Sequence, residues 1–395
     1  MPSPLEGRRL WLAGIGGAGM SAYAALARAW GAEVRGWDRV RTPYLDQLDE
    51  IGIEIEISDE PPAPPDGWEV FVSTAFAARV PGKSRAELLA ELVSLREAIV
   101  VAGAHGKTTT SAMIAFCLER LGRDPAWLIG AEIPQLGGNA GTGGGWLVVE
   151  GDESDRTIAS LRPRVAVVTN IDLDHHTTFG SRAEVVDMFT SWLAQVPQSV
   201  RGEELVPYDG PLRVAGEHNR RNAACAIATL ELTGLTREQV EPVLAEFGGA
   251  ARRLERRGEA AGVEVYDDYA HHPAEIEATL AALGDDRRLV VLFQPHLYSR
   301  TRHLARELAA ALAAAHTVAV TDVYPAREAP VENVTGKLVV DALTELRPGM
   351  TVAWTPSVEE GAAFLRSVVR PGDRVVTMGA GDVDQAAAVL LEALG

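Results

Sequence analysis

A lysine followed by three threonines stands directly behind a short glycine-rich segment, Gly103–Thr110, which reads GAHGKTTT. In a loop of this kind, backbone N–H groups surround the phosphates of a nucleotide, the lysine neutralises their charge and a threonine hydroxyl reaches Mg²⁺. The whole chain has three lysines, Lys83, Lys107 and Lys337, so the position of Lys107 is informative. The segment predicts a phosphate-binding loop, although Val101 stands where a regular Walker A sequence has a glycine.

A second glycine-rich segment, Gly14–Gly19, reads GIGGAG and lies between an expected strand at 9–14 and an expected helix from Met20 to about Trp30. Asp38 ends the next expected strand. This G-x-G-x-x-G pattern is typical of dinucleotide-binding folds, in which the backbone approaches a diphosphate at a helix N-terminus and the acid binds a ribose hydroxyl. Tight packing of strand on helix would explain the glycines without a ligand. Because strand, helix and acid are all present, we predict a diphosphate-binding loop, whose pattern does not say which nucleotide is bound.

The two loops point to different chemistry when each is considered alone. An oxidoreductase would need the first loop and would have no use for the second, and an ATPase would need only the second. Both loops are used if one domain binds a nucleotide-linked substrate and the next domain binds ATP.

Two acidic segments follow expected strands next to the phosphate-binding loop. The strand at 146–151 ends in Glu150–Asp155, and the strand at 165–170 ends in Asn170–His176. Carboxylates at the carboxyl ends of neighbouring parallel strands lie where a Mg²⁺ ligand of an ATP site belongs. Either segment could instead be a solvated loop, but their shared position favours a metal site.

The sequence alternates β-branched apolar runs with alanine- and leucine-rich amphipathic segments, which is typical of βαβ units with parallel sheets. Strands are expected at 9–14, 33–38, 69–73, 98–103, 146–151, 165–170, 263–267, 288–294, 317–322, 351–354 and 374–378. Most are continuous apolar runs, as in strands covered on both faces. The glycine-dense segment 137–145 is expected to be a flexible or closely approached loop, and the glycine pair at 248–249 a hinge.

Composition and charge exclude several classes of protein. The chain has 395 residues, of which 47% are hydrophobic and 23% charged, as in ordinary globular enzymes. Its 55 acidic and 37 basic residues give a net charge of −18, so we expect no nucleic-acid partner. We expect neither membrane insertion nor a signal peptide, because no apolar run approaches the roughly 20 residues of a membrane span. The two cysteines, Cys117 and Cys225, are expected to be reduced core residues of a cytoplasmic protein.

Together these motifs resemble the Mur ligases over nearly the whole chain. The segments that carry the resemblance are Gly14–Ser21, Gly103–Thr110, Glu150–Asp155, Val168–His175, Gly216–Ala223, Arg252–Arg253, Asp267–Pro273 (DDYAHHP), Phe293–Thr301 (FQPHLYSRT) and Gly379–Val383. DDYAHHP and FQPH point to the branch of the family that adds alanine. No single motif is specific, but the set is highly specific.

The resemblance implies an α/β fold of three domains. These are a Rossmann-like domain at 1–97 that binds a UDP-sugar, a central P-loop-type ATPase domain with a mainly parallel sheet at 98–250, and a Rossmann-like domain at 251–395 that binds the amino acid. It also implies an enzyme of peptidoglycan precursor synthesis, on which cell shape and cell division depend. Such an enzyme joins L-alanine to the carboxylate of UDP-N-acetylmuramate through an acyl phosphate, with ATP and Mg²⁺. The oligomeric state is left open.

The resemblance further assigns roles to single residues. Expected to contact the UDP-sugar are Gly14, Gly16, Gly17, Gly19, Met20, Ser21, Asp38, Ser73 and Thr74. Expected to contact ATP are Gly103, His105, Gly106, Lys107, Thr108, Thr109, His218, Asn219, Asn222, Arg253 and Asp268. The expected metal ligands are Thr108, Glu150 and His175. The expected catalytic residues are Lys107, His271 and Arg300, with His271 as the base for the ammonium proton.

The sequence departs from the family pattern at a few positions. Leu297 stands where many relatives have arginine, His176-Thr177-Thr178 stands where an acid usually follows the histidine, and Gly151 replaces an alanine. Three alternatives therefore stay open: a ligase that attaches a recycled peptide to the same sugar nucleotide, an NAD-dependent oxidoreductase based on the first loop alone, and a non-catalytic sensor of sugar nucleotides.

Several sister ligases carry a carbamylated lysine in the central domain, after the histidine that binds the second metal. Here no lysine occurs between Lys107 and Lys337, so none follows His175 in that domain. A carboxylate from the next expected helix, Glu184 or Asp187, is one replacement, and the alternative is that both are solvated surface acids. We expect activity that does not depend on bicarbonate.

Overall fold

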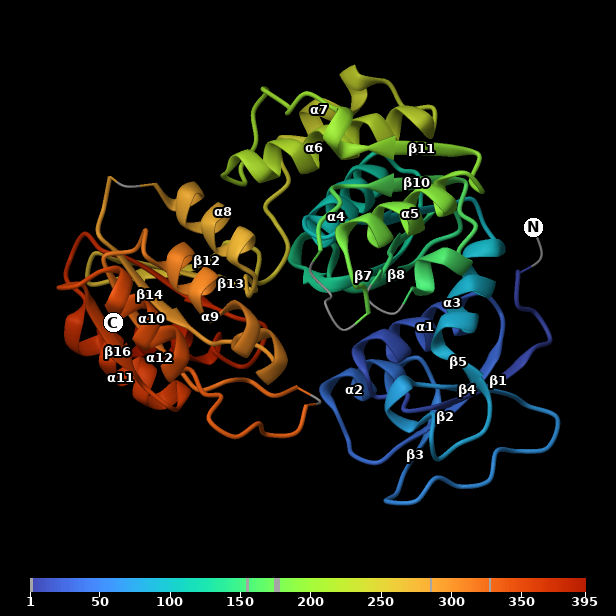
Figure 1. Ribbon diagram of the computed structural model, residues 1–395. Coiled ribbons are helices and arrows are strands. Elements are labelled where there is room, and N and C mark those ends of the chain that lie inside the picture. Colours follow the sequence, from blue (N-terminus) through green and yellow to red (C-terminus); the bar gives the residue numbers. More distant parts are fainter. Residues whose placement is uncertain (1–2, 154–155, 174–177, 285, 327) are drawn as a thin grey trace. The chain divides into compact units, whose positions relative to one another are not determined.

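The computed structural model describes residues 3–153, 156–173, 178–284, 286–326 and 328–395. The chain forms two compact units, one of Met1–Arg213 with Arg220–Gly248 and one of Val214–Asn219 with Gly249–Gly395. The first unit holds two sheets and the second holds one (Figure 1). The hinge expected at 248–249 coincides with a boundary between the units. Among the described residues, no helix has both the length and the apolar character to cross a membrane.

The N-terminal sheet has parallel strands in the order β3-β2-β1-β4-β5. Its elements are β1 (Arg9–Ala13), α1 (Ala18–Ala29), β2 (Glu33–Asp38), α2 (Pro43–Glu50), β3 (Glu54–Ile57), β4 (Glu69–Val72), β5 (Lys83–Ser84) and α3 (Arg85–Ser94). The strand order reverses at β1, because β2 and β4 lie on its two sides. In such sheets a ligand binds at the carboxyl ends of the strands at the reversal, and the loop Gly14–Gly19 lies there.

The central sheet has the order β11-β10-β6-β9-β7-β8 and is parallel except for the β7–β8 pair. Its strands are β6 (Ala98–Ala102), β7 (Ala126–Ile133), β8 (Gly138–Thr142), β9 (Leu147–Glu150), β10 (Val165–Val168) and β11 (Gln198–Arg201). The helices of this part of the chain are α4 (Lys107–Arg120), α5 (Arg182–Leu193), α6 (Glu217–Leu232) and α7 (Arg237–Leu244). Strands β6 and β10 are buried along their whole length, which explains their unbroken apolar sequences, AIVVA and VAVV.

The sheet of the second unit has the order β12-β13-β17-β14-β15-β16 and is parallel except for the β12–β13 pair. Its strands are β12 (Glu255–Ala260), β13 (Val263–Asp268), β14 (Leu289–Phe293), β15 (Thr317–Val320), β16 (Thr351–Trp354) and β17 (Arg374–Met378). Its helices are α8 (Pro273–Leu283), α9 (Tyr298–Leu312), α10 (Lys337–Leu346), α11 (Val358–Val368) and α12 (Gln385–Leu394). One apolar cluster joins the sheet to α8, α9 and α10, and another joins it to α11 and α12. The sheet is therefore covered on both faces, as its apolar strands predict.

All eleven strands expected from the sequence are present, within two residues at either end. Strands β3, β5, β7, β8, β11 and β12 were not expected. The edge strands β3 (EIEI) and β12 (ERRGEA) carry charges and give no apolar run. The prediction of a loop at 137–145 was wrong in part, because Gly138–Thr142 forms β8. The close approach expected there is confirmed, since a Cβ atom on Gly141 would lie 2.2 Å from the Trp127 ring.

Candidate functional sites

The phosphate-binding loop predicted at Gly103–Thr110 connects β6 to α4. Gly103 and Gly106 have φ angles of +128° and +80°, which residues with side chains rarely adopt. A Cβ atom on Gly103 would lie 2.3 Å from Thr169 Oγ1, and one on Gly106 would lie 2.3 Å from Asn222 Oδ1. Both glycines are therefore required by the shape of the loop and by the residues packed on it, and Asn222 lies at the loop as predicted.

The Lys107 ammonium is held inside this loop. It donates to the carbonyl oxygens of Gly103 at 2.6 Å and Ala104 at 3.2 Å, and to Glu153 Oε1 at 3.1 Å. Burial by itself would lower the pKa of Lys107, but the Glu153 and Glu150 carboxylates outweigh burial and the pKa is raised. Lys107 is thus a cation at neutral pH, placed where the loop would hold a phosphate.

Glu150, at the end of β9, lies beside the first turn of α4. Thr108 Oγ1 donates to Glu150 Oε1 at 3.0 Å, and Gly130 N–H donates to Glu150 Oε2 at 2.8 Å. A carboxylate and a hydroxyl are hard oxygen donors of the kind that Mg²⁺ takes, so these two predicted ligands fit the ion. The third predicted ligand, His175, lies outside the described residues. Within them, no three or more His, Cys, Asp or Glu side chains gather around one metal position.

Asn170, directly after β10, holds the middle of the phosphate-binding loop, a role that the sequence analysis missed. His105 N–H donates to Asn170 Oδ1 at 3.0 Å. In return, Asn170 Nδ2 and Thr169 Oγ1 donate to His105 O at 2.8 Å and 2.6 Å. The N–H and the carbonyl of His105 are both used within the protein, which fixes the loop before any ligand binds. Polar residues directly after a buried strand are the signal that indicates such contacts.

The glycine-rich loop after β1 is held in a similar way. Gly16 N–H donates to Asp38 Oδ2 at 2.8 Å, and Thr42 Oγ1 donates to Gly16 O at 2.7 Å. The other carboxylate oxygen, Asp38 Oδ1, accepts from Arg39 N–H at 2.7 Å. Asp38 is buried and both of its oxygens are engaged, so it braces the loop. The predicted contact with a ribose hydroxyl would come in addition to these bonds.

The glycines of this loop differ in their surroundings. A Cβ atom would lie 2.2 Å from Ser73 Oγ on Gly14 and 2.9 Å from Asp38 Oδ2 on Gly16, so the protein itself fills both positions. Gly17 is exposed and has φ −74° and ψ 143°, and a Cβ atom there would meet only a backbone oxygen at 3.7 Å. Of these three glycines, Gly17 leaves room for a ligand against the backbone.

The other residues predicted for this site lie at the same end of the sheet. Ser73 follows β4 and faces Gly14, and Thr74 begins a 3-10 helix, Thr74–Phe76. Met20 is buried in the apolar core, and the buried Ser21 hydroxyl donates to Ala18 O at 3.1 Å. The side chains of Met20 and Ser21 thus face the protein, so their predicted contacts with a ligand are limited to the backbone.

In the second unit, Asp268 ends β13 in a buried position. It accepts from the N–H groups of Leu254 and Ala270 at 2.7 Å each and from Thr279 Oγ1 at 3.1 Å. Burial raises the pKa of Asp268 to about 6, against the attraction of Arg253. A carboxyl group with such a pKa, at the carboxyl end of a parallel strand, is typical of a functional position.

His271 and Arg300, both predicted to be catalytic, are connected through His296. The ring centroids of His271 and His296 are 5.4 Å apart, and Arg300 Nη1 lies 3.2 Å from His296 Nδ1. His271 Nδ1 lies 2.8 Å from the carbonyl oxygen of Tyr269, which favours the tautomer with the proton on Nδ1. The cluster lies at the carboxyl ends of β13 and β14, where ligands bind in this kind of sheet.

The remaining predicted ATP contacts fall in both units. His218 and Asn219 belong to the short N-terminal segment of the second unit. Asn219 Nδ2 donates to Ala215 O at 2.7 Å, and burial lowers the pKa of His218, so its imidazole is neutral at pH 7. Thr109 belongs to the first unit and is buried in the first turn of α4.

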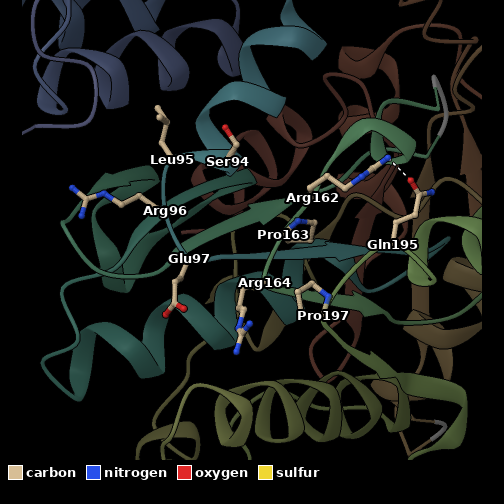
Figure 2. A pocket seen from close by; sticks show the side chains of 9 residues that line it. All are labelled: Ser94, Leu95, Arg96, Glu97, Arg162, Pro163, Arg164, Gln195 and Pro197. Atoms are coloured by element: carbon tan, nitrogen blue, oxygen red, sulfur yellow. Dashed lines mark hydrogen bonds between the residues drawn. The ribbon is translucent and has the colours of Figure 1, made fainter.

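A cavity of about 490 Å³ lies at the opposite, amino-terminal ends of β6 and β10 (Figure 2). Three arginines line it, Arg96, Arg162 and Arg164, and their side chains point in different directions. Arg162 is bonded to Gln195. Because parallel sheets of this kind bind ligands at the carboxyl ends of their strands, this cavity is not the predicted ATP site.

Comparison with known proteins identifies the family. Three family models match the chain: "Mur ligase family, catalytic domain" at 12–97, "Mur ligase middle domain" at 101–201, and "Mur ligase, glutamate ligase domain" at 252–381. The chain is 36% identical to the UDP-N-acetylmuramate–L-alanine ligase of Renibacterium salmoninarum, over 98% of this chain and 96% of that protein. The ligase of the same name from Kineococcus radiotolerans is 40% identical over 95% and 94%. The chain belongs to the Mur ligase family.

A solved Mur ligase has the same fold. The UDP-N-acetylmuramate–alanine ligase of Thermotoga maritima matches this Mur ligase with a TM-score of 0.77 and 26% identity over 98% of both chains. A murein peptide ligase of Psychrobacter arcticus, with a TM-score of 0.65 and 24% identity, shows likeness of fold alone. The predicted α/β fold and the predicted class of enzyme, an ATP-dependent amide-forming ligase, are confirmed. The alternative of an NAD-dependent oxidoreductase is excluded.

Proposed function

We propose that this Mur ligase joins L-alanine to the carboxylate of UDP-N-acetylmuramate with the use of ATP, as a step of peptidoglycan precursor synthesis in the cytoplasm. Relatives named for this reaction are 34–40% identical over nearly the whole chain. The observation that carries the proposal is that the first unit holds two glycine-rich loops, each at the carboxyl edge of its own parallel sheet. One chain can therefore hold a sugar nucleotide and ATP together.

The proposed division of labour follows the three sheets. Residues 1–97 would bind the UDP-sugar, residues 98–250 would bind ATP, and residues 251–395 would bind the amino acid. The family models support this division, because each matches within one of these ranges. The two cysteines support a reducing compartment, because both are buried and neither forms a disulfide.

The chemistry proposed is amide formation in two steps. The muramyl carboxylate attacks the γ-phosphorus of ATP, the bond to ADP breaks, and an acyl phosphate forms. The amine of alanine then attacks the acyl carbon, the bond to phosphate breaks, and inorganic phosphate leaves. ATP supplies the phosphoryl group, and Mg²⁺ offsets its negative charge.

The chain's own residues would position and neutralise the reacting groups. Lys107 would bind the transferring phosphoryl group, and Thr108 and Glu150 would hold Mg²⁺. His175 is proposed as a ligand of a second metal. His271 would take the proton from the ammonium group of alanine, and Arg300 would orient a carboxylate or phosphate beside it.

A phosphate-release assay tests the proposal. Purified protein is incubated with ATP, Mg²⁺, UDP-N-acetylmuramate and one of L-alanine, glycine, L-serine or a cell-wall tripeptide. We expect release only when all components are present and fastest release with L-alanine. Faster release with the tripeptide would favour the peptide-ligase alternative, and binding of UDP-N-acetylmuramate without any release would favour the sensor.

A further inference from the structure

Arg85, the first residue of α3, lies against the first turn of α1, next to the glycine-rich loop (Figure 1). A Cβ atom on Gly19 would lie 3.2 Å from Arg85 Nη1 and 4.0 Å from Arg85 Cζ. The guanidinium therefore occupies the space that a side chain at position 19 would need. In this fold, the last glycine of the motif makes room for an arginine.

No carboxylate neutralises Arg85 in the part of the chain that the structure describes. Helix α1 contains no acidic residue. On α3, Glu87 accepts from the backbone and hydroxyl of Ser84, and Glu91 pairs with two other basic residues. Asp38, the buried acid of the loop, is engaged by two backbone N–H groups. Every acid named here has another partner.

Other basic residues of the same sheet are paired, which makes Arg85 distinctive. Arg8 and Lys83 share Glu69 and Glu91, and Arg79 bonds to Glu60 at 2.8 Å. A chain with a net charge of −18 has ample carboxylates for its arginines. An arginine without one, beside the positive end of a helix, concentrates positive charge that an anion would relieve.

We infer that Arg85 binds the diphosphate of the sugar nucleotide, together with the backbone N–H groups of the first turn of α1. The guanidinium fork matches two phosphate oxygens, and its charge is already beside the helix end that attracts anions. Gly17 and Ala18, at that helix end, are exposed, so the N–H groups there are open to a ligand. The inference deepens the proposed function and depends on it, because it names a residue that holds the substrate.

Calorimetric titration with UDP and with ATP tests the inference on wild type, Arg85→Ala and Arg85→Lys. The matched control is Arg79→Ala, which removes an arginine of the same sheet that has its own acidic partner. We expect Arg85→Ala to weaken UDP by about tenfold to hundredfold, Arg85→Lys to weaken it less, and both to leave ATP unchanged. Arg79→Ala should leave both affinities unchanged.

Two further readouts separate binding from folding. UDP affinity should fall less steeply with added NaCl in Arg85→Ala than in wild type, because one charge contact is missing. The melting temperature without ligand should be unchanged in Arg85→Ala, because Arg85 has no carboxylate partner to lose. Unchanged UDP affinity, or equal losses for UDP and ATP, would overturn the inference while leaving the proposed function intact. If wild type binds neither UDP nor UDP-N-acetylmuramate, the proposed function itself fails.

Discussion

Two neighbouring glycines allow loss of fold and loss of ligand to be measured separately. A methyl group on Gly16 would lie 2.9 Å from Asp38 Oδ2 and 3.1 Å from Thr42 Oγ1, the two atoms that hold the loop. A methyl group on Gly17 would meet no protein atom closer than 3.7 Å, and the backbone angles there suit alanine. We therefore predict that Gly16→Ala lowers stability, whereas Gly17→Ala lowers affinity for UDP-N-acetylmuramate and preserves stability.

The magnitudes follow from the contacts. Disturbing the two hydrogen bonds at Gly16 should lower the free energy of unfolding by about 1–3 kcal/mol, which is a fall in melting temperature of roughly 2–12 °C. At Gly17 two effects oppose each other. Alanine is a poorer N-cap than glycine by about 0.5–1 kcal/mol, and a less flexible unfolded chain stabilises by about 0.4–1 kcal/mol, so the net change is within about 0.5 kcal/mol.

The expected loss of affinity at Gly17 is larger than its effect on stability. A methyl group between the backbone and a diphosphate would remove at least one charge-assisted hydrogen bond, worth about 1.5–3 kcal/mol, or about tenfold to 150-fold in affinity. Thermal melting without ligand and calorimetric titration with UDP-N-acetylmuramate and ATP give the two quantities. ATP affinity should be unchanged in both variants, because the ATP loop belongs to another sheet.

Two results would refute this reasoning. Wild-type affinity of Gly17→Ala for UDP-N-acetylmuramate would show that no ligand approaches the loop at this residue. A fall in melting temperature as large for Gly17→Ala as for Gly16→Ala would show that the surroundings of the two glycines do not differ as described.

Four further predictions concern the ATP site and the second unit. Lys107→Ala should abolish phosphate release and leave UDP-N-acetylmuramate affinity intact by calorimetry, with Lys337→Ala as control; equal loss of both ligands would contradict separate sites. Glu150→Ala should raise the Mg²⁺ concentration for half-maximal phosphate release by about tenfold or more, through loss of a hard oxygen ligand, and an unchanged titration would count against that role. The pKa of Asp268 is about 6 in the fold against an ordinary 3.8, so the fold favours its neutral form and wild type gains stability as pH falls from 7 towards 4. The melting temperature of wild type relative to Asp268→Asn should therefore rise as pH falls from 7 to 5, and a difference independent of pH would refute it. Glu184→Ala should keep the Mg²⁺ dependence of wild type, and wild-type activity should be unaffected by bicarbonate; activation by bicarbonate at fixed pH, reversed on degassing, would contradict this.

The buried strands could be predicted from the sequence because they have one simple physical cause. A strand covered on both faces has to be apolar throughout, and β6, β10 and β14 are. Strands at the edges escape this rule. The β7–β8 hairpin escapes it differently, because Gly141 is there to admit the Trp127 ring from the neighbouring strand. Only the pairing of the two strands gives that glycine its meaning.

The loops of the candidate site could be predicted, but not the contacts that hold them. Glycine spacing predicts a tight turn at a helix N-terminus from local sequence alone. The bonds from Asp38 to Gly16 and from Asn170 to His105 join residues 22 and 65 positions apart. They exist because β2 lies beside β1 and β10 lies beside β6, and strand order is a property of the whole sheet. Arg85 was missed for the same reason.

The contacts of Glu184 explain why this chain can lack a central lysine to carbamylate. Glu184 Oε2 accepts from Gly180 N–H at 2.9 Å, and its other oxygen pairs with Arg156. The Gly180 N–H and the guanidinium lower the pKa of Glu184, which caps α5 rather than facing a metal. Glu153, by contrast, is buried and lies 3.1 Å from the Lys107 ammonium. A second carboxylate is thus already present beside the phosphate-binding loop, on the segment that follows β9. A carboxylate made from lysine and CO₂ would add negative charge where Glu150 and Glu153 already act on Lys107, which is the physical reason to expect activity without bicarbonate.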